Sequence, residues 1–479
     1  MTAEKILIST GSGEVRIAEL DGGALVGLTI DRIGGESLVG HIYIGRVEAV
    51  IHNLQAAFVD LGLERAGFLG LAETRPHGAG TDDAIGDYLN EGEKVLVQVT
   101  RDAQADKGPR VTLRPVLTGR DLVFTPGQQT VSISRRITDA DERDRLAAVV
   151  EAAVTEAGGF IVRTAAQEAE DEDIAEEGAR LLDRWAALRA RADDEAPPAR
   201  IHSELEAALR ILRDRSGADL SGVWVDDPDL HARIKDYVET DLPDLADILH
   251  LHSGGTALFA EEGVDELIDA ALDPVVRLPS GGSIQISETP ALVAVDVNAG
   301  PAAGGNRERA IMEVNREAAA EIGRQIMLRN LSGLMVIDFI SMRHADSQEK
   351  VKHALMAALA DDPQRPFVGG FTRFGLVELT RRRKGPSLSE IHFGGPAQPV
   401  KSAMTTALEA LRAVLVEAAA SPAAGFTLEV GAAVADILDG AAAEALDAAE
   451  AKLGGSLEIV TDERLAADAY RVAGKGKDA

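Results

Sequence analysis

Residues 281–340 read GGSIQISETPALVAVDVNAGPAAGGNRERAIMEVNREAAAEIGRQIMLRNLSGLMVIDFI, which is the most regular stretch of the chain. Within it, the segments GSIQISE, ALVAVD and LMVID predict three strands. Residues 307–329, between the last two segments, predict an amphipathic helix. Its apolar side carries Ile311, Val314, Ala318, Ile322 and Ile326. A strand, a helix and a strand in this order form a crossover unit, so the two flanking strands are expected to be parallel.

Two acidic residues end these two strands. Asp296 closes ALVAVD and Asp338 closes LMVID, so parallel strands bring both carboxylates to one edge of the sheet. With the side-chain amide of Asn298, they suit one hard cation such as Mg²⁺, which prefers a few carboxylates, waters and a substrate phosphate. Such an ion activates water for phosphodiester hydrolysis. The alternative is that each aspartate merely caps the turn after its strand.

The first part of the chain reads as β-structure. Residues 1–36 alternate apolar and polar residues and predict two or three antiparallel strands. Residues 37–118 contain five short strand-like segments and predict a small closed barrel. From residue 119 onward, residues 139–157 and 174–192 predict helices, the second of them highly charged, with a strand at GGFIVRT between them. The alanine-rich tail from residue 400 predicts a small α/β domain with strands at TLEV and LEIV.

Aromatic and cationic residues on the predicted barrel are candidates for nucleic-acid contact. Phe58 and Phe68 fall on successive strands, and Lys107 lies in the segment ADKGPR. Stacking rings with a nearby cation suit single-stranded nucleic acid, although a phenylalanine in a barrel strand more often belongs to the core.

Arginines outside the barrel offer a second candidate site. Arg135 and Arg136 lie in SISRRIT, while Arg163 and Thr164 lie in FIVRT. Guanidinium groups and a hydroxyl can hold a terminal phosphate, although surface arginines are the commoner case. The basic run 381–384 reads as a solvated face, whereas Arg373 in GFTRFG is expected near the aspartate edge.

Composition limits the class of protein. The 479 residues carry 49 basic and 79 acidic side chains, a formal net charge of −30, which argues against sequence-blind binding of polyanions. Cysteine is absent, so disulfides, thiolate zinc sites and cysteine nucleophiles are excluded. No histidine spacing supports a metal site. No apolar run reaches the ~18 residues that a membrane span needs, and the N-terminus lacks the apolar segment of a signal peptide. We therefore expect a soluble, cytoplasmic protein without a membrane segment.

The order of these segments resembles the catalytic region of the ribonuclease E/G family of bacterial endoribonucleases. The resemblance extends from about residue 5 to about residue 475. It is carried by HIYIGRVEAV with AAFVDLGLERAGFL, by SRRI, FIVRTA, RLPSGGSI and ALVAVDVN, by NREAAAEIGRQIMLRNLSGLMVIDFISM, and by RFGLVELTRRR. The pair DVN and GLMVIDF, with the helix between them, is the most specific part.

The resemblance implies a multidomain α/β (α+β) fold. The expected subdomains are a split RNase H-like subdomain at 1–36 and 209–271, an OB-type RNA-binding barrel at 37–118, a 5′-sensor at 119–208, a DNase I-like catalytic subdomain at 272–395 and a small C-terminal α/β domain at 400–475.

The resemblance also assigns roles to residues. Asp296 and Asp338 become magnesium ligands, and Asn298 orients them and the attacking water. Phe58, Phe68, Lys107 and Arg373 become RNA-binding residues. The pocket for a 5′-monophosphate is expected from Gly119, Val123, Arg135, Arg163 and Thr164.

The chain departs from the family in four places. The cysteine motif of the zinc link is missing, and the corresponding region reads SLSEIHFGGPAQP. The loop AGPAAGG after Asn298 lacks a common arginine, and Ser341 replaces a second acid. The acidic run 168–177 follows the sensor arginine closely, which is expected to weaken phosphate capture. We also expect no long C-terminal scaffold for a degradosome, as in the short, ribonuclease G-like form.

The resemblance implies a Mg²⁺-dependent endoribonuclease that cleaves single-stranded RNA, prefers 5′-monophosphorylated substrates and acts in RNA processing or decay. The products would carry a 5′-phosphate and a 3′-hydroxyl. We expect no structural zinc, a homodimer held by side-chain packing, and a less secure tetramer. The alternatives are a catalytically weakened or inactive RNA-binding protein on the same scaffold and, less favoured, a purely structural role.

Overall fold

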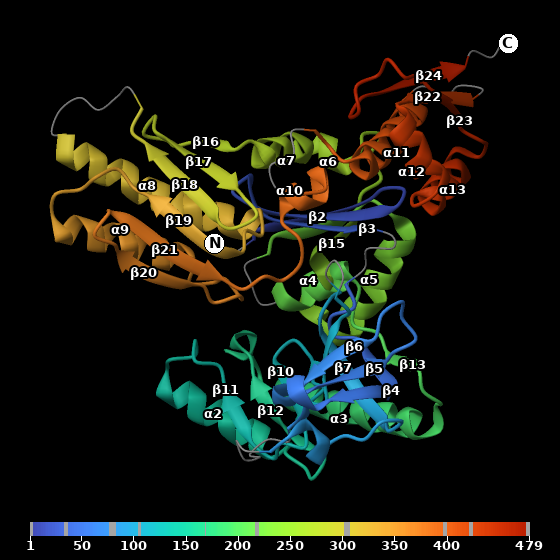
Figure 1. Cartoon of the computed structure of the whole chain (residues 1–479), viewed down its shortest axis with the longest axis vertical. Coiled ribbons are helices and arrows are strands. Elements are labelled where there is room, and N and C mark those ends of the chain that lie inside the picture. The colour runs from blue at the N-terminus through green and yellow to red at the C-terminus, as the bar shows by residue number, and fades with distance from the viewer. Residues whose placement is uncertain are drawn as a thin grey trace. The chain divides into compact units, whose positions relative to one another are not determined.

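The computed structural model describes residues 3–32, 37–75, 83–103, 107–167, 169–215, 220–300, 307–395, 400–420 and 425–475 (Figure 1). The chain divides into two compact units. Unit 1 consists of Met1–Glu36, Ala218–Arg233 and Ile248–Ala479, and unit 2 consists of Ser37–Gly217 and Ile234–Asp247. Several sheets with helices confirm a mixed α/β architecture, while the subdomain names and boundaries stay predictions.

The first sheet of unit 1 joins distant parts of the sequence. Its strand order is β15-β14-β1-β2-β3, in which β1–β3 are antiparallel, as predicted, and β14 pairs with β1 in parallel. The strands are β1 (Lys5–Thr10), β2 (Glu14–Asp21), β3 (Ala24–Arg32), β14 (Gly222–Val225) and β15 (Leu249–Leu251). Helices α6 (Leu258–Glu261) and α7 (Val264–Leu272) pack apolar side chains against it.

A buried carboxylate ties this sheet to the C-terminal domain. Glu14 lies 3.0 Å from Arg32 Nε and 3.8 Å from Arg16 Nε, and it also pairs with Arg412. Burial alone would raise the pKa of Glu14, but the three guanidinium groups hold it below the usual value. A buried charge without partners is costly, so the three arginines fix where β2 can lie.

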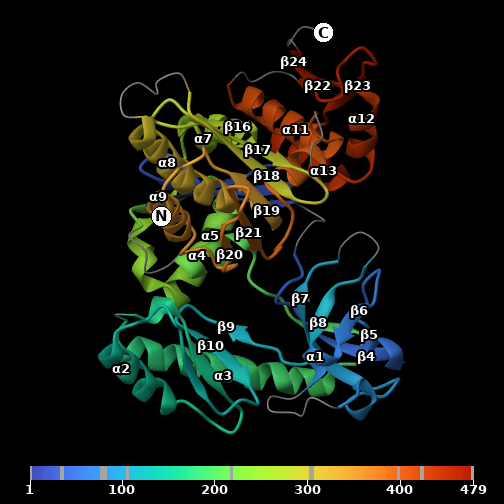
Figure 2. The same cartoon turned by 60° about the vertical axis from the view of Figure 1, so that its left-hand side comes forward.

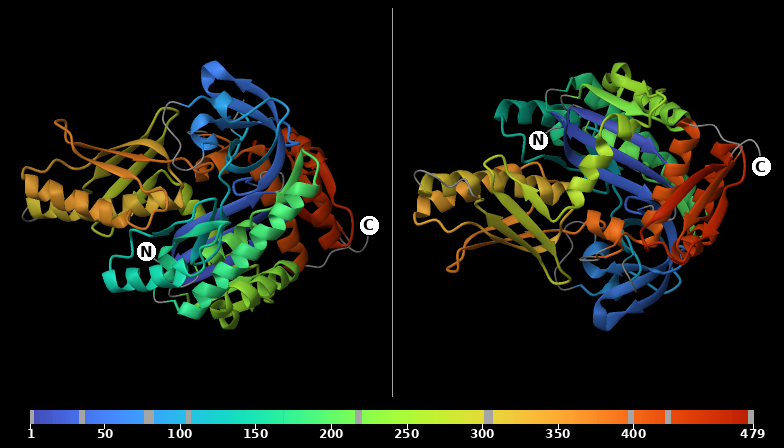
Figure 3. Two further views of the ribbon diagram at one scale, coloured as in Figure 1. Left: turned by 90° about the horizontal axis from the view of Figure 1, so that it is seen from below. Right: turned by 90° about the horizontal axis from the view of Figure 1, so that it is seen from above.

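The second sheet of unit 1 contains the sequence stretch that defines the fold. Its order is β16-β17-β18-β19-β21-β20, and β18 and β19 are parallel, as predicted. The strands are β16 (Val275–Arg277), β17 (Ser283–Glu288), β18 (Val293–Asn298), β19 (Gly333–Asp338), β20 (Phe367–Phe371) and β21 (Leu376–Arg381). Helices α8 (Arg307–Leu328) and α9 (Ala345–Ala358) lie side by side along one face (Figure 3).

Packing against these helices decides which strand residues are buried. Val293, Val295 and Val297 point to the helix layer and join Val314 and Ile322 of α8 in one core. Because strand side chains alternate, the residues between the valines face away from the helices.

The prediction of a solvated basic run at 381–384 is wrong at its first residue. Arg381 is buried, with its Nε 2.6 Å from Asp362 Oδ2 and its Nη1 2.8 Å from Asn330 Oδ1. Its position on β21 turns it to the helix side, and a fork-like guanidinium satisfies several acceptors there. The other three residues of the run are exposed.

The C-terminal part of unit 1 has its own core. Its sheet order is β23-β22-β24, covered by three helices. The elements are α11 (Ala403–Ala420), β22 (Gly425–Val430), α12 (Ala432–Asp439), α13 (Ala443–Leu453), β23 (Glu458–Thr461) and β24 (Tyr470–Lys475). The sequence predicted this α/β segment but not β24.

Unit 2 begins with the predicted barrel. Five strands close in the order β4-β5-β6-β8-β7, since β7 also pairs with β4, and β13 adds an outer edge. The strands are β4 (Ile42–Ile51), β5 (Ala56–Asp60), β6 (Gly67–Gly70), β7 (Lys94–Arg101), β8 (Arg110–Thr112) and β13 (Ala199–His202). All five predicted strand segments are confirmed.

The rest of unit 2 is a sheet of order β11-β12-β10-β9 with helices packed on it. Its elements are β9 (Leu117–Thr118), β10 (Leu122–Pro126), β11 (Val131–Ile133), α2 (Ala140–Glu151), β12 (Gly158–Val162) and α3 (Asp171–Asp194). The long helix α3 packs against this sheet and runs across the lower part of Figure 2. The helix expected at 139–157 ends earlier, at Glu151, because Thr155 to Gly158 form a turn.

One acid of the predicted acidic run is buried. The carboxylate of Glu177 on α3 accepts the backbone N–H groups of Asp121 and Leu122 at 3.1 Å and so holds the turn between β9 and β10. Burial and the charge of Asp121 raise the pKa of Glu177 to about 7, although the two N–H groups work to lower it. Among the described residues, no helix combines the length and the apolar character needed to cross a bilayer.

The raised pKa of Glu177 predicts a pH-dependent cost to stability. The ordinary pKa is 4.5, so the folded chain binds more protons than the unfolded chain between pH 4.5 and about 7, and the stabilisation from neutral Glu177 is lost as pH rises through that range. Glu177→Gln should therefore gain up to about 3 kcal/mol relative to wild type between pH 5 and pH 8. Urea unfolding at the two pH values measures this.

The matched control is Glu176→Gln, one residue earlier, whose side chain is 73% exposed. The free energy of unfolding of this control should differ little from that of wild type at either pH. A stability difference between Glu177→Gln and wild type that stays constant from pH 5 to pH 8 would contradict the assignment.

Candidate active site

The two candidate metal-binding carboxylates are register partners. Asp296 on β18 pairs directly with Asp338 on β19, and both side chains are exposed on the face away from α8 and α9. Neighbouring strands lie about 4.8 Å apart, so paired residues on one face are adjacent. The sequence predicted that the two strands are parallel, and the in-phase register brings the carboxylates together.

An asparagine orients the first carboxylate. Asn298 follows two residues after Asp296 on the same face, and its Nδ2 donates a hydrogen bond of 2.8 Å to Asp296 Oδ2. Within the described part of the chain, neither aspartate accepts a backbone N–H, so the turn-capping alternative has no support from the contacts.

The arrangement fits a magnesium ion that keeps most of its waters. In the described segments, no three His, Cys, Asp or Glu side chains gather as a metal cage. Two adjacent exposed carboxylates are what Mg²⁺ uses when substrate phosphate and water complete its octahedron. Asp296 and Asp338 are therefore the residues able to hold such an ion.

The register also identifies neighbours that the sequence did not single out. Gln285 on β17 pairs with Asp296, and Arg277 on β16 pairs with Ser283, which pairs with Asn298. Gln285 and Arg277 are exposed on the carboxylate face. Pairing across three strands is a long-range property, so no local sequence signal marks these two residues.

A buried asparagine fixes the chain just after Asp338. Asn315 on α8 is 0% exposed, its Nδ2 donates to Ile340 O at 2.8 Å, and its Oδ1 accepts from Ile340 N at 3.1 Å. A polar residue beside the apolar side of an amphipathic helix was the available signal. Ser341, where the family has an acid, is exposed next to this segment.

The barrel carries its two candidate aromatics on the outside. Phe58 pairs with Phe68 across β5 and β6, their ring centroids are 5.9 Å apart at 75°, and both rings are half-buried. Their neighbours Ala57, Val59 and Leu69 fill the barrel core instead. The expectation that a barrel phenylalanine is usually core does not hold here.

Basic residues lie on the segment next to this aromatic pair. The guanidinium of Arg110 lies 5.4 Å from the Phe68 ring, and the Phe68 N–H donates to Pro109 O at 2.7 Å, two residues after the exposed Lys107. Phe68, Arg101 and Arg110 also line an open groove of about 460 Å³. Arg101 and Arg110 were not predicted, because strand arginines are common on any barrel.

The five candidate phosphate-binding residues lie around β9–β12. The parallel strands β11 and β12 end together at the pair Ile133–Val162, so Arg135 and Arg163 leave the same edge. Thr164 Oγ1 lies 2.9 Å from Ser134 Oγ. Val123 on β10 pairs with Thr118, directly before Gly119.

Arg163 is already engaged by neighbours. Its Nη1 donates to the carbonyl oxygens of Gly119 at 2.7 Å and Arg120 at 3.1 Å, and its Nη2 lies 2.8 Å from Asp214 Oδ1. Burial works to raise the pKa of Asp214, but Arg213 and Arg163 hold it below its usual value, so this carboxylate stays charged. A phosphate has to compete with Asp214 for Arg163.

Gly119 is required by a close approach. A Cβ at this position would lie 1.8 Å from Glu177 Oε1. Through Glu177 the acidic run therefore supports the turn that contains Gly119, while its exposed members are expected to repel a phosphate.

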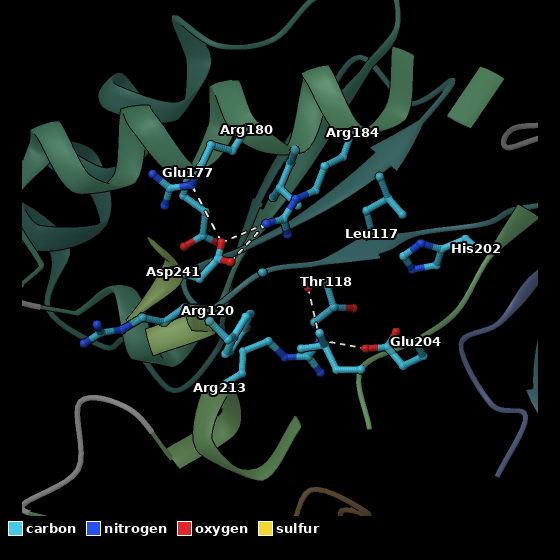
Figure 4. Close-up of a pocket in the computed structure, with 14 residues that line it drawn as sticks. Leu117, Thr118, Arg120, Glu177, Arg180, Arg184, His202, Glu204, Arg213 and Asp241 are labelled. Carbon is cyan, nitrogen blue, oxygen red and sulfur yellow. Dashed lines mark hydrogen bonds and ion pairs between the residues drawn. The ribbon is translucent and has the colours of Figure 1, made fainter. Parts of the chain in front are cut away.

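A small polar cavity of about 60 Å³ lies beside this loop, and Figure 4 shows its lining. Arg184 Nη2 donates to both oxygens of Asp241 at 2.9 and 3.1 Å, and Arg213 Nη1 lies 2.8 Å from Glu204 Oε1. These guanidinium groups are paired with carboxylates and help to hold the turn at Gly119 in place. The residues that line the cavity therefore offer no free cationic site for an anion.

Arg373 lies in the turn between β20 and β21. Leu376, which follows that turn, pairs with Asp338. The turn is therefore at the carboxylate end of the sheet, as expected for Arg373.

Comparison with known proteins identifies the family of this chain. The model of the Ribonuclease E/G family matches residues 116–384. Ribonuclease G of Salmonella typhimurium is 35% identical over 96% of this chain and 97% of its own length, and that of Haemophilus influenzae is 36% identical over 82% of each. Ribonuclease E of Escherichia coli is 35% identical over 80% of this chain but only 37% of its own length. The predicted resemblance is thus confirmed, and the chain belongs to the ribonuclease E/G family.

Proposed function

We propose that this chain is a Mg²⁺-dependent endoribonuclease that cleaves single-stranded RNA in cytoplasmic RNA processing or decay. The observation that carries the proposal is the in-register pair Asp296–Asp338 on the exposed face of a sheet whose other face is packed. Family membership supplies RNA as the substrate class.

Asp296 and Asp338 would hold the ion, which when bound supplies Lewis acidity that lowers the pKa of water and offsets phosphate charge. Asn298 fixes the orientation of the Asp296 carboxylate, and Asn315 holds the backbone after Asp338. In the reaction, a water oxygen bonds to phosphorus and the bond to the 3′ oxygen breaks. The products carry a 5′-phosphate and a 3′-hydroxyl.

The barrel face supplies RNA affinity. Phe58 and Phe68 offer half-buried rings for base stacking, worth about 1–3 kcal/mol for each base. Arg110 places positive charge beside the Phe68 ring for the phosphates, and the exposed Lys107 adds a cation two residues before Pro109, whose carbonyl oxygen accepts the Phe68 N–H. A local cationic surface of this kind would let a chain with a net negative charge bind RNA.

The loop of Gly119, Val123, Arg135, Arg163 and Thr164 would recognise a 5′-monophosphate. Arg163 and Thr164 supply donors, and Arg135 is exposed at the same edge. The charged Asp214 keeps Arg163 oriented and sets the cost of capture.

Zinc is not expected to assemble this protein. The chain has no cysteine, and the nearest histidine to the family's link, His392, is buried with Nδ1 3.0 Å from Leu388 O. Burial lowers the pKa of His392 to about 4, so it is a neutral core residue. We propose a homodimer held by side-chain packing.

Asp296→Asn and Asp338→Asn should each lower cleavage by about 10²–10⁴-fold, because a charged metal ligand is lost while shape is kept. RNA binding should survive or tighten. Turnover of a single-stranded oligonucleotide in Mg²⁺ and anisotropy binding in chelator measure the two effects. Asp346→Asn, exposed on α9 in the helix layer, is the control. Wild-type turnover in either site variant would remove the metal assignment and favour the non-catalytic RNA-binding alternative.

Wild type should cleave a 5′-monophosphorylated substrate with higher kcat/KM than the 5′-hydroxyl form. Arg163→Ala should abolish the difference, since charge-assisted hydrogen bonds worth about 1.5–3 kcal/mol are lost. Asp214→Asn should enlarge it, because the competing carboxylate charge is removed. Arg189→Ala, exposed on α3, is the control and should leave the ratio unchanged. Equal kcat/KM on both substrates in wild type would mean that the loop does not sense the 5′ end.

Purified protein should contain no stoichiometric zinc, and its dimer should dissociate on dilution but not on chelation. Elemental analysis and light scattering, before and after a strong chelator, test this. One zinc for each two chains, or a loss of mass on chelation, would be the contrary result.

A further inference from the structure

Hydrogen bonds fix the conformation of the turn between β20 and β21. Thr372 Oγ1 accepts the backbone N–H groups of Phe374 at 3.3 Å and Leu376 at 3.2 Å, and Thr372 O accepts from Gly375 N at 2.9 Å. Gly375 has a φ of +85°, which favours glycine. The turn therefore presents its side chains in one defined geometry.

This turn carries an exposed aromatic ring. Phe374 is 75% exposed, and the guanidinium of Arg373 lies 4.8 Å from its ring centroid. All eleven phenylalanines lie within the described ranges, and only Phe374 and Phe367 are exposed. A single exposed apolar side chain is common on protein surfaces, so the position of this ring and its contact with a cation carry the argument.

The register places the turn that carries this ring at the end of the sheet where the candidate metal site lies. Leu376 pairs with Asp338, whereas Phe367 pairs with Thr380, four residues farther along β21. At about 3.3 Å for each residue, Phe367 is roughly 13 Å away along the strand. Of the two exposed rings, Phe374 is the one at the carboxylate end.

We propose that Phe374 stacks on a base of the RNA strand beside the scissile phosphate, with Arg373 pairing to an adjacent phosphate. This inference rests on the proposed function of Asp296 and Asp338. A ring and a cation in contact match the two chemical parts of a nucleotide, its base and its phosphate. A subunit interface would need a continuous apolar patch, and the neighbours of this ring in the turn, Thr372 and Gly375, are polar or small.

Phe374→Ala should lower kcat/KM about 5- to 100-fold through KM, the equivalent of one lost base stack. Phe374→Trp should restore it, while the Mg²⁺ concentration for half-maximal activity stays unchanged in both variants. Phe367→Ala, with the same side chain at 72% exposure on the same hairpin, is the matched control and should stay within twofold of wild type.

Abasic substitution in the RNA locates the stacked base. Single abasic nucleotides are scanned across the cleavage site with wild type and with Phe374→Ala. One position should cost wild type the same factor as the mutation does, and it should cost Phe374→Ala nothing more. That non-additivity is the signature of one ring on one base.

Three results would overturn the proposal: equal effects of Phe374→Ala and Phe367→Ala, abasic effects that are additive at every position, or a lower mass of Phe374→Ala in light scattering, which would identify a subunit contact. Asp338→Asn separates the two ideas. If it is inactive while Phe374→Ala behaves as wild type, only the stacking inference fails. If Asp338→Asn is fully active, the proposed function fails, and the stacking inference, which rests on it, fails with it.

Discussion

The alternation of side chains along two parallel strands is the constraint on which the candidate site depends. Val293, Val295 and Val297 must face α8 to bury their apolar surface, and this requirement turns Asp296 and Asn298 to the open face. The same rule acts on β19, where Met335 and Ile337 are buried and Asp338 is exposed. A slip of one residue in either strand would bury a carboxylate, so the hydrophobic core itself holds the two aspartates level.

Much of this could be read from the sequence, because it depends on local periodicity. The strand–helix–strand unit at 281–340 and the five barrel segments are visible as patterns of apolar residues, the helix at 174–192 is visible as a charged segment, and the structure has all of them. The aspartate pair could be predicted for the same reason, since each residue ends an apolar strand. The early end of α2 at Glu151 and the buried Arg381 could not, because a turn at Thr155 and a partner at Asp362 decide them.

What the sequence missed is set by contacts between distant residues. Asn315 meets Ile340, Asp214 meets Arg163, and Glu177 meets the turn before Leu122. In each case the residue type is ordinary for its helix, and only the tertiary partner gives it a role. The acidic run shows the difference most clearly, because its charge suggested repulsion of phosphate, while one of its members supports the turn that contains the candidate residue Gly119.

The pairing of β1 with β14 has a consequence for the order of folding during synthesis. More than 200 residues separate the two strands, and most of unit 2 lies between them. At a translation rate of about 5–20 residues per second, the β1 edge waits roughly 10–40 s for its neighbour. In that interval the two sheets of unit 2, whose strands all lie within Ser37–Gly217, can form on the ribosome, whereas the host sheet keeps an open apolar edge. The last segment of unit 2, Ile234–Asp247, follows β14 and joins afterwards, and the high contact order of unit 1 makes its closure the late step in biogenesis.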